Sequence, residues 1–278
     1  MRFSSFLSSA LLLIGSAVEG YCQSDCIDAS IIAHTGTPEG STIVHDGLTI
    51  YVAEPGKKNK RAKARKGAAV LFLSDVFGLS IPESKLLADS YARAGYLTII
   101  PDLFDGNPAP EDLNDPNFNT TEFFMLHNPS TIDPKIAKAI NYLRVNKNIS
   151  KIGAPGYCFG GRYSFRFAGA SGVASGPSNA FIDAAFAAHP SLLEDEEIEA
   201  IGAPAAIAAA EDDPLFADAA RLNAEVLLRG TNQPYRTTLY SGTHHGFGVR
   251  VDLSDDEQRE GKEDAFLQAV AWFDRYLI

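Results

Sequence analysis

The stretch GYCFGG, residues 156–161, places a cysteine between glycines at the end of an apolar run. It has the form Gly-x-nucleophile-x-Gly, in which small residues two before and two after the nucleophile let a strand and a helix approach closely. The pattern predicts a strand near Ile152, a sharp turn at Cys158 and a helix from Gly161. The amide of Phe159 then points toward a reacting carbonyl, and the helix start favours a thiolate and an oxyanion. A buried structural cysteine is the alternative interpretation, because cysteine is often buried.

Short apolar runs alternate with helical patterns on both sides of this turn. This alternation implies a mostly parallel sheet with helices on both faces, and no linker divides the chain. The sequence therefore predicts an α/β fold with one domain at residues 41–278, preceded by a polar lead-in at residues 21–40. We expect strands at residues 69–73, 96–100, 181–188, 205–210 and 235–240, and helices starting at Pro82, over 135–146, over 215–229 (with Leu215, Leu222 and Val226 facing inward) and at the C-terminus.

The remaining segments read as turns and loops. Asp46-Gly47 lies between two β-rich runs and predicts a hairpin. Residues 57–66, KKNKRAKARK, carry seven positive charges and are interpreted as a solvated loop between two strands, rather than as a nuclear-localisation signal or a polyanion patch. Residues 105–129 are rich in Asn, Pro and Asp and predict a long surface loop. The net charge of −11 argues against nucleic acid as a partner.

Residues 1–20 predict a secretory signal peptide. Arg2 supplies a positive start, and residues 6–14 form an apolar run that is too short to span a bilayer. A buried N-terminal helix is the alternative. We therefore expect a secreted protein with no membrane partner after the signal is removed. Two acceptor sequons, at Asn119 and Asn148, fit glycosylation of a secreted chain.

The chain contains three cysteines, Cys22, Cys26 and Cys158. Cys22 and Cys26 are able to pair if their segment curls, because an extended segment would hold them too far apart for a disulfide. Such a pair leaves Cys158 as a free thiol. Two cysteines with no matching histidine pattern do not make a zinc site, so we predict no metal.

Reactive side chains follow several of the predicted strands. Asp75 follows the strand predicted at residues 69–73, and Cys158 follows the strand near Ile152. Asp212 and Asp213 follow residues 205–210, and His244 and His245 follow residues 235–240. Ligands of such sheets bind beyond the carboxyl ends of the strands, where a nucleophile, a base and an orienting carboxylate would meet. His245, followed by Gly246-Phe247, is favoured as the base over His244, and Asp213 is favoured over Asp212 by a smaller margin. The other histidines are interpreted as surface or loop residues without partners: His34, His45, His127 and His189.

From about Thr35 to the C-terminus, the chain resembles the dienelactone hydrolase family, which has the α/β-hydrolase fold. The motifs that carry the resemblance are spread along the whole chain, and the form with Asp75 is similar to the fungal branch. These motifs are SDVFGL (74–79), LLADSYARAGY (86–96), PDLF (101–104), GYCFGG (156–161), AAAEDDPLF (208–216) and HHGFGVR (244–250).

The resemblance implies a role for each reactive residue. Cys158 would be the nucleophile, His245 the base, and Asp213 the carboxylate that orients the histidine. The amides of Val76 and Phe159 would form the oxyanion hole. In the family, an acidic side chain precedes the first of these amides and helps to control the resting thiol. Here that residue is Asp75, one methylene shorter than the glutamate of the bacterial enzymes.

Two departures from the family concern the substrate. The bacterial enzymes carry an arginine shortly after the PDL motif, whereas this chain has Gly106 near that place. A second arginine is offset, since Val249 precedes Arg250. Dienelactone itself is therefore not the expected substrate. Arg162 and Arg250 are candidate contacts for a substrate anion, with surface roles as the alternative.

These observations predict a secreted hydrolase that acts on a small lactone or carboxylic ester through Cys158 and needs no cofactor. The expected partner is the small-molecule substrate. A thioesterase or a general carboxylesterase of the same fold is the first alternative. A non-catalytic binding protein that keeps the fold is the second, and the presence of thiol, imidazole and acid speaks against it.

Overall fold

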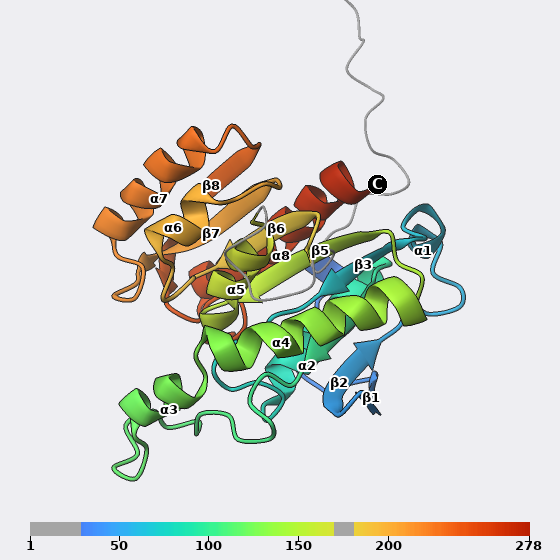
Figure 1. Ribbon diagram of the computed structural model, residues 1–278, viewed down its shortest axis with the longest axis horizontal. Helices are drawn as coiled ribbons and strands as arrows, with labels where there is room; N and C mark the ends of the chain where they lie inside the picture. The colour runs from blue at the N-terminus through green and yellow to red at the C-terminus, as the bar shows by residue number, and fades with distance from the viewer. Residues whose placement is uncertain (1–28, 170–180) are drawn as a thin grey trace, which may run out of the picture.

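A computed structural model describes residues 29–169 and 181–278 of the chain. An eight-stranded sheet of order β1-β2-β4-β3-β5-β6-β7-β8 runs through the molecule (Figure 1). The pairs β1–β2 and β2–β4 are antiparallel, and the other neighbouring pairs are parallel, as the alternating sequence pattern predicts. The strands are β1 (Ser41–His45), β2 (Leu48–Ala53), β3 (Ala68–Leu71), β4 (Leu97–Pro101), β5 (Lys151–Tyr157), β6 (Ala184–Ala188), β7 (Ala205–Asp212) and β8 (Tyr235–His244).

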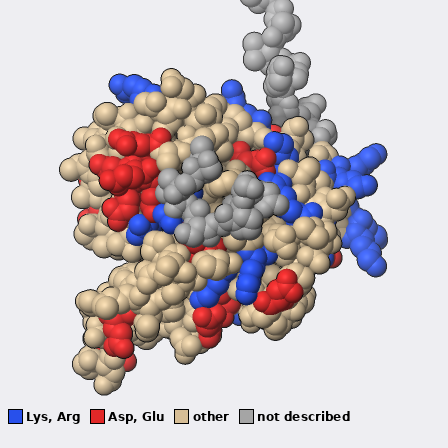
Figure 2. All heavy atoms as spheres, viewed as in Figure 1, with Lys and Arg blue, Asp and Glu red and all other residues tan. Residues whose placement is uncertain are grey.

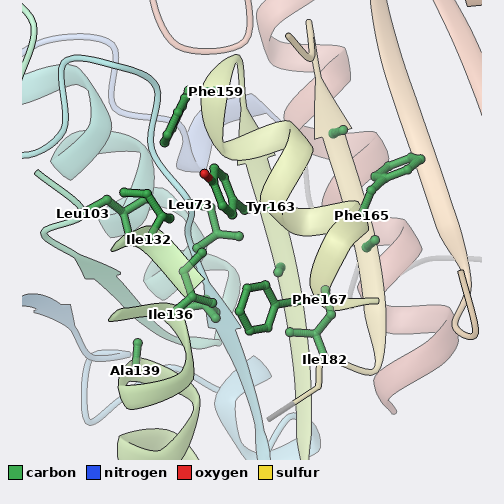
Figure 3. Packing of buried hydrophobic residues seen from close by; sticks show 14 of the residues in the cluster. Leu73, Leu103, Ile132, Ile136, Ala139, Phe159, Tyr163, Phe165, Phe167 and Ile182 are labelled. Atoms are coloured by element: carbon green, nitrogen blue, oxygen red, sulfur yellow. The ribbon is translucent and has the colours of Figure 1, made fainter. Parts of the chain in front are cut away.

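Helices cover both faces of this sheet, which confirms the predicted α/β class. One hydrophobic cluster packs α4 to α7 on one face, and a second packs α2 and α8 on the other. Figure 3 shows Ile132 and Ile136 of α4 beside Leu73 and Phe167, within the first cluster. The helices are η1 (Ala29–Ile31), α1 (Arg61–Ala64), α2 (Pro82–Ala94), α3 (Thr120–Leu126), α4 (Pro129–Asn141), the π-helical turn η2 (Tyr142–Asn146), α5 (Phe159–Phe167), α6 (Asp195–Glu199), α7 (Asp218–Gly230) and α8 (Asp256–Leu277).

Local signals in the sequence account for several of these boundaries. The β1–β2 hairpin turns at Asp46 and Gly47, whose φ angles are 47° and 75°, as a two-residue turn requires. Pro82 occupies the first turn of α2, and Gly95 ends that helix with a φ of 107°. The hairpin and α2 therefore lie where the sequence predicts them.

The basic segment connects β2 and β3, as predicted, but part of it is ordered as α1. Arg65 is buried and pairs with Asp274 of α8 at 2.7 Å, so this cation supports the fold. Figure 2 shows a group of Lys and Arg side chains beside α1, and acidic side chains gather over α6 and α7.

The prediction of a long surface loop over residues 105–129 is wrong in part, because α3 forms within it. Asn119 caps this helix, since its side chain accepts a hydrogen bond from the Glu122 amide at 3.1 Å. Phe123 is buried against Phe104, with ring centroids 5.4 Å apart. A seven-residue helix carries too short a pattern to detect, and a tertiary aromatic contact stabilises it.

The predicted inward face of α7 is also wrong. Leu215, Leu222 and Val226 are 57%, 54% and 63% exposed, whereas Ala224 and Leu228 are buried. The helix packs through Ala224 and Leu228, one turn apart, whereas Leu222 and Val226 face outward and Leu215 precedes the helix. Hydrophobic spacing identified the helix correctly but could not identify which of its two apolar stripes meets the sheet.

Candidate active site

Cys158 lies in a strained turn between β5 and α5. Its φ of 51° and ψ of −114° fall in a region that residues other than glycine rarely adopt. A Cβ added at Gly156 would collide with the carbonyl of Gly160, and a Cβ at Gly160 would collide with the carbonyl of Leu73. The two glycines therefore permit the close contact of strand and helix, as the GYCFGG pattern predicts.

His245 and Asp213 form a buried pair at the ends of β8 and β7. Nδ1 of His245 donates to the two carboxylate oxygens of Asp213, at 2.8 and 2.9 Å. The amides of Leu215 and Phe216 also donate to this carboxylate, at 2.9 and 3.1 Å. These bonds fix the carboxylate and, through it, the orientation of the imidazole ring.

The neighbouring acid and histidine form a separate, exposed pair. Nδ1 of His244 lies 3.3 Å from Asp212, and both side chains are largely exposed to solvent. The structure thus brings Asp213 together with His245 and directs Asp212 and His244 away from them, in line with the choice made from the sequence.

Cys158 and His245 line one cavity with a volume of about 450 Å³. Burial lowers the pKa of His245, but the hydrogen bond to Asp213 and the adjoining Cys158 outweigh burial and raise this pKa to about 9. Nε2 of His245 is buried and has no hydrogen-bond partner within the described ranges. The ring is therefore held at one nitrogen, while the other is free to exchange a proton.

Asp75 is buried next to this cavity and is engaged on both oxygens. Oδ1 accepts from the Phe77 amide at 3.0 Å, and Oδ2 accepts from Arg250 at 2.7 Å. Burial raises the pKa of Asp75, and the nearby Arg250 charge opposes that rise. The guanidinium of Arg250 also lies over the Phe77 ring, 4.0 Å from its centroid. Arg250 lines the cavity, as expected for a substrate contact, but it is paired with Asp75.

Arg162 does not reach the cavity, so its predicted role as a substrate contact is wrong. It pairs with Glu197 at 3.0 Å and with Glu194 at 3.6 Å. Glu197 is itself buried on α6. Arg162 therefore joins α5 to α6, because it lies on the face of α5 that packs against that helix.

Val76 lines the cavity with Cys158, and Phe159 follows Cys158 at the start of α5. The amides of Val76 and Phe159 donate no hydrogen bond to any residue that the structure describes. The Val76 carbonyl accepts from Ala109 at 2.9 Å, which fixes the loop after β3.

Sequence reasoning missed two residues that follow β6. Ser191 is buried, its Oγ lies 3.6 Å from Sγ of Cys158, and its amide donates to the Cys158 carbonyl at 3.1 Å. His189 is fully buried, with its ring 5.0 Å from that of His245. Their position could have identified them, because His189-Pro190-Ser191 directly follows β6, just as Asp213 follows β7 and His245 follows β8.

The prediction that His189 is a surface or loop residue without partners is therefore wrong. The Gly248 amide donates to its Nδ1 at 3.3 Å, which leaves the ring proton on Nε2. Burial lowers the pKa of His189 well below its usual value, and the charges of His245 and Arg250 lower it further. The other histidines also have neighbours: His34 contacts Glu263, His45 contacts Asp46, and His127 packs on Phe104 and Phe123.

Several predictions fall outside the site or outside the described residues. The signal peptide and the pair Cys22 and Cys26 lie in residues 1–28, which the structure does not describe. Both sequon asparagines, Asn119 and Asn148, are exposed. In residues 29–169 and 181–278, no cluster of three or more His, Cys, Asp or Glu side chains could hold a metal. No helix in those ranges is long and apolar enough to cross a bilayer.

The strand order, the turn after β5 and the acid and histidine after β7 and β8 define an α/β hydrolase. The solved structure of a dienelactone hydrolase from Anabaena variabilis has this fold, with a TM-score of 0.58 and 17% identity over 87% of this chain and all of that chain. The family model for the dienelactone hydrolase family matches residues 51–277. This chain belongs to the dienelactone hydrolase family.

Curated fungal relatives cover most of the chain. Hydrolase pyvD of Aspergillus violaceofuscus is 36% identical over 252 residues, which span 91% of this chain and 96% of that protein. Dienlactone hydrolase 1 of Gibberella moniliformis is 33% identical over 250 residues, which span 88% of this chain and 90% of that protein. The chain therefore belongs among the fungal members of the family, as its motifs indicated.

Proposed function

We propose that this protein hydrolyses carboxylic esters or lactones through a thiolate at Cys158. One observation carries the proposal: Cys158 and His245 line the same cavity, and a buried Asp213 holds the imidazole from its far side. Nucleophile, base and orienting carboxylate come from three separate strand ends. A structural cysteine would require neither the strained turn nor the pair behind it.

The first half of the reaction forms a thioester. Nε2 of His245 accepts the thiol proton, and the thiolate of Cys158 attacks the carbonyl carbon to form a C–S bond and an oxyanion. The intermediate collapses, the C–O bond breaks, and the alkoxide takes the proton from the imidazolium of His245. In a lactone, the alkoxide stays tethered to the acyl group.

The second half releases the acid. His245 removes a proton from water, and the hydroxide attacks the thioester carbonyl. The C–S bond then breaks, the carboxylic acid leaves, and the imidazolium of His245 returns its proton to the sulfur of Cys158. Asp213 favours the imidazolium in both halves, since it contributes to the raised pKa of His245. The ring thus carries the proton between steps without changing its orientation.

The oxyanion is assigned to the amides of Val76 and Phe159. Both are free of hydrogen bonds to other described residues, and Phe159 begins α5. Such amides stabilise the charge that develops on the carbonyl oxygen, and losing one donor typically costs about 10²–10³ in turnover. Ser191 is assigned the role of stabilising the thiolate, because its hydroxyl lies close enough to the sulfur of Cys158 to donate a weak hydrogen bond.

The nucleophile is tested by iodoacetamide labelling with mass mapping, alongside turnover of p-nitrophenyl acetate. We expect fast modification of Cys158 with a matching loss of turnover, and no turnover in Cys158→Ala. A Cys22→Ala/Cys26→Ala double variant is the matched control and should keep both properties. Full turnover in Cys158→Ala would overturn the proposal. A panel of lactones, linear esters and thioesters separates a lactone hydrolase from the carboxylesterase and thioesterase alternatives.

Secretion forms a second part of the proposal, supported by the apolar leader and the two exposed sequons. Expression in a eukaryotic host should deliver the chain to the medium, with a mass that peptide N-glycosidase reduces. Asn119→Gln and Asn148→Gln should each remove one glycan. Retention inside the cell with no glycan would contradict it.

A further inference from the structure

The cavity lined by Cys158 and His245 is an apolar pocket over most of its surface. Its wall consists largely of phenylalanine side chains, and leucines surround its mouth. The wall residues are Phe77, Phe118, Phe123 and Phe124, and the mouth residues are Leu113, Leu192 and Leu215.

Contacts between aromatic rings hold this wall in place. Phe123 is buried and packs on Phe118 with ring centroids 5.5 Å apart. Phe124 stacks on Phe159, the residue after the nucleophile, at 6.2 Å and 25°. The Asn119 cap orders the helix that presents these rings. The aromatic wall is therefore ordered next to Cys158 before any ligand binds.

The leucines at the mouth extend this surface outward. Leu113, Leu192 and Leu215 are 46%, 43% and 57% exposed, and they come from three different loops. Large apolar side chains in such positions cost free energy in water unless a ligand covers them. Their convergence on one opening indicates a ligand that reaches from the sulfur to the rim.

The charges at the pocket argue against a small anion. Among the described lining residues, two side chains can carry a positive charge: His245, which is paired with Asp213, and Arg250. The guanidinium of Arg250 is bound to Asp75 at 2.7 Å and lies over Phe77. A substrate carboxylate would have to compete with a buried carboxylate for this arginine, whereas an apolar group meets no such competition.

We propose that the pocket selects esters and lactones that carry a bulky apolar group, such as a medium alkyl chain or an aromatic ring, next to the reacting carbonyl. This inference rests on the proposed function and names its substrate class. The volume of about 450 Å³ corresponds to roughly 15 water molecules at about 30 Å³ each. A small acyl group leaves most of that space filled with water, and a larger apolar group displaces it.

The test compares p-nitrophenyl acetate, butyrate and hexanoate, each corrected for its rate of hydrolysis by hydroxide. We expect kcat/KM to rise by up to about fourfold per added methylene, the factor equivalent to about 0.8 kcal/mol, and by at least about tenfold from acetate to hexanoate. α-Pentyl-γ-butyrolactone should exceed γ-butyrolactone in the same way, since the two share a ring and differ only in the apolar group next to the carbonyl. A flat series, or a preference for a small lactone that carries a carboxylate, would overturn the inference.

Two leucines with similar solvent exposure, one at the pocket and one away from it, provide a test variant and its matched control. Leu215 lies at the mouth, whereas Leu222 on α7 is 54% exposed and does not line the pocket. Leu215→Asp should lower the ratio of hexanoate to acetate turnover several-fold, and Leu222→Asp should leave it unchanged. Because both side chains are exposed, neither change is expected to prevent folding. Equal ratios in the two variants would count against the pocket.

A binding measurement separates this inference from the proposed function. Hexanamide should protect Cys158 from iodoacetamide at a concentration at least about tenfold lower than acetamide does, whether or not esters are hydrolysed. If no ester is turned over, the proposed function fails, and the protection series still decides the specificity. Equal protection by both amides would refute the apolar pocket.

Discussion

The contribution of Asp213 to the reaction is open to a direct test by Asp213→Asn. Burial works against a charged His245, but the bond to Asp213 and the adjoining Cys158 raise its pKa from 6.5 to about 9. One pKa unit is worth about 1.36 kcal/mol, so this rise, which Asp213 and Cys158 share, corresponds to roughly 3.4 kcal/mol, or about 300-fold, in favour of the imidazolium. Asparagine retains an acceptor for the Leu215 and Phe216 amides but removes the charge.

We therefore expect Asp213→Asn to lower kcat/KM for p-nitrophenyl hexanoate by about 100-fold or more, with little change in folding. The same variant should react more slowly with iodoacetamide near neutral pH, because the imidazolium that accompanies the thiolate is less stable. The assay pairs initial rates with the rate of Cys158 alkylation, and thermal unfolding reports on the fold.

The adjacent acid supplies the control. Asp212 is exposed and contacts His244 instead, so Asp212→Asn should keep at least about half of the wild-type rate, as expected of a surface change. If Asp213→Asn retained a third or more of the activity, or if both variants lost activity equally, the assignment of Asp213 as the partner of His245 would be refuted.

Three further predictions follow from single contacts. Ser191→Ala should slow Cys158 alkylation by roughly threefold to tenfold, the loss expected for one weak bond to a charged sulfur, while Ser191→Thr restores most of the rate. Gly160→Ala should lower Tm by several degrees because its Cβ meets the Leu73 carbonyl, whereas Gly230→Ala, with open space around its Cβ, should leave Tm equal or higher. Burial lowers the pKa of Lys262 to about 8 although Glu83 and Glu263 oppose this. Its charge therefore destabilises the fold below about pH 8, and the penalty fades as the pH approaches 10.5, so Lys262→Met should raise Tm near neutral pH and lose that advantage near about pH 10.

Local sterics explain why the nucleophile turn was visible in the sequence. Gly156, Cys158 and Gly160 act within a few residues of each other, and the glycines are needed because two backbone segments touch there. The hairpin at Asp46-Gly47 and the ends of α2 follow from equally local rules. Such features depend on the backbone alone and can be read before any tertiary contact is known.

Three features that depend on distant contacts were not predicted. α3 exists because Phe123 packs on Phe104, a partner outside its own segment. His189 is a buried neighbour of His245, although 56 positions separate them in the chain. Arg162 turned out to pair with Glu197 of α6. In each case the deciding partner lies on another element, and no periodicity within the segment reports it.

The sequence by itself determined the alternating α/β plan, the strained cysteine turn and the set of reactive residues at the strand ends, since these depend on short-range sterics and hydrophobic period. The sequence favoured Asp213 and His245, but only the tertiary structure showed that the two side chains meet and that Arg250, and not Arg162, lines the pocket. The register of β7 against β8 shifts between Ala210 and Asp212, and such an irregularity changes which side chains point to each side of a strand. Asp212 therefore pairs with His244 at the surface, and its neighbour Asp213 becomes the buried partner of His245. Only the folded sheet specifies this pairing.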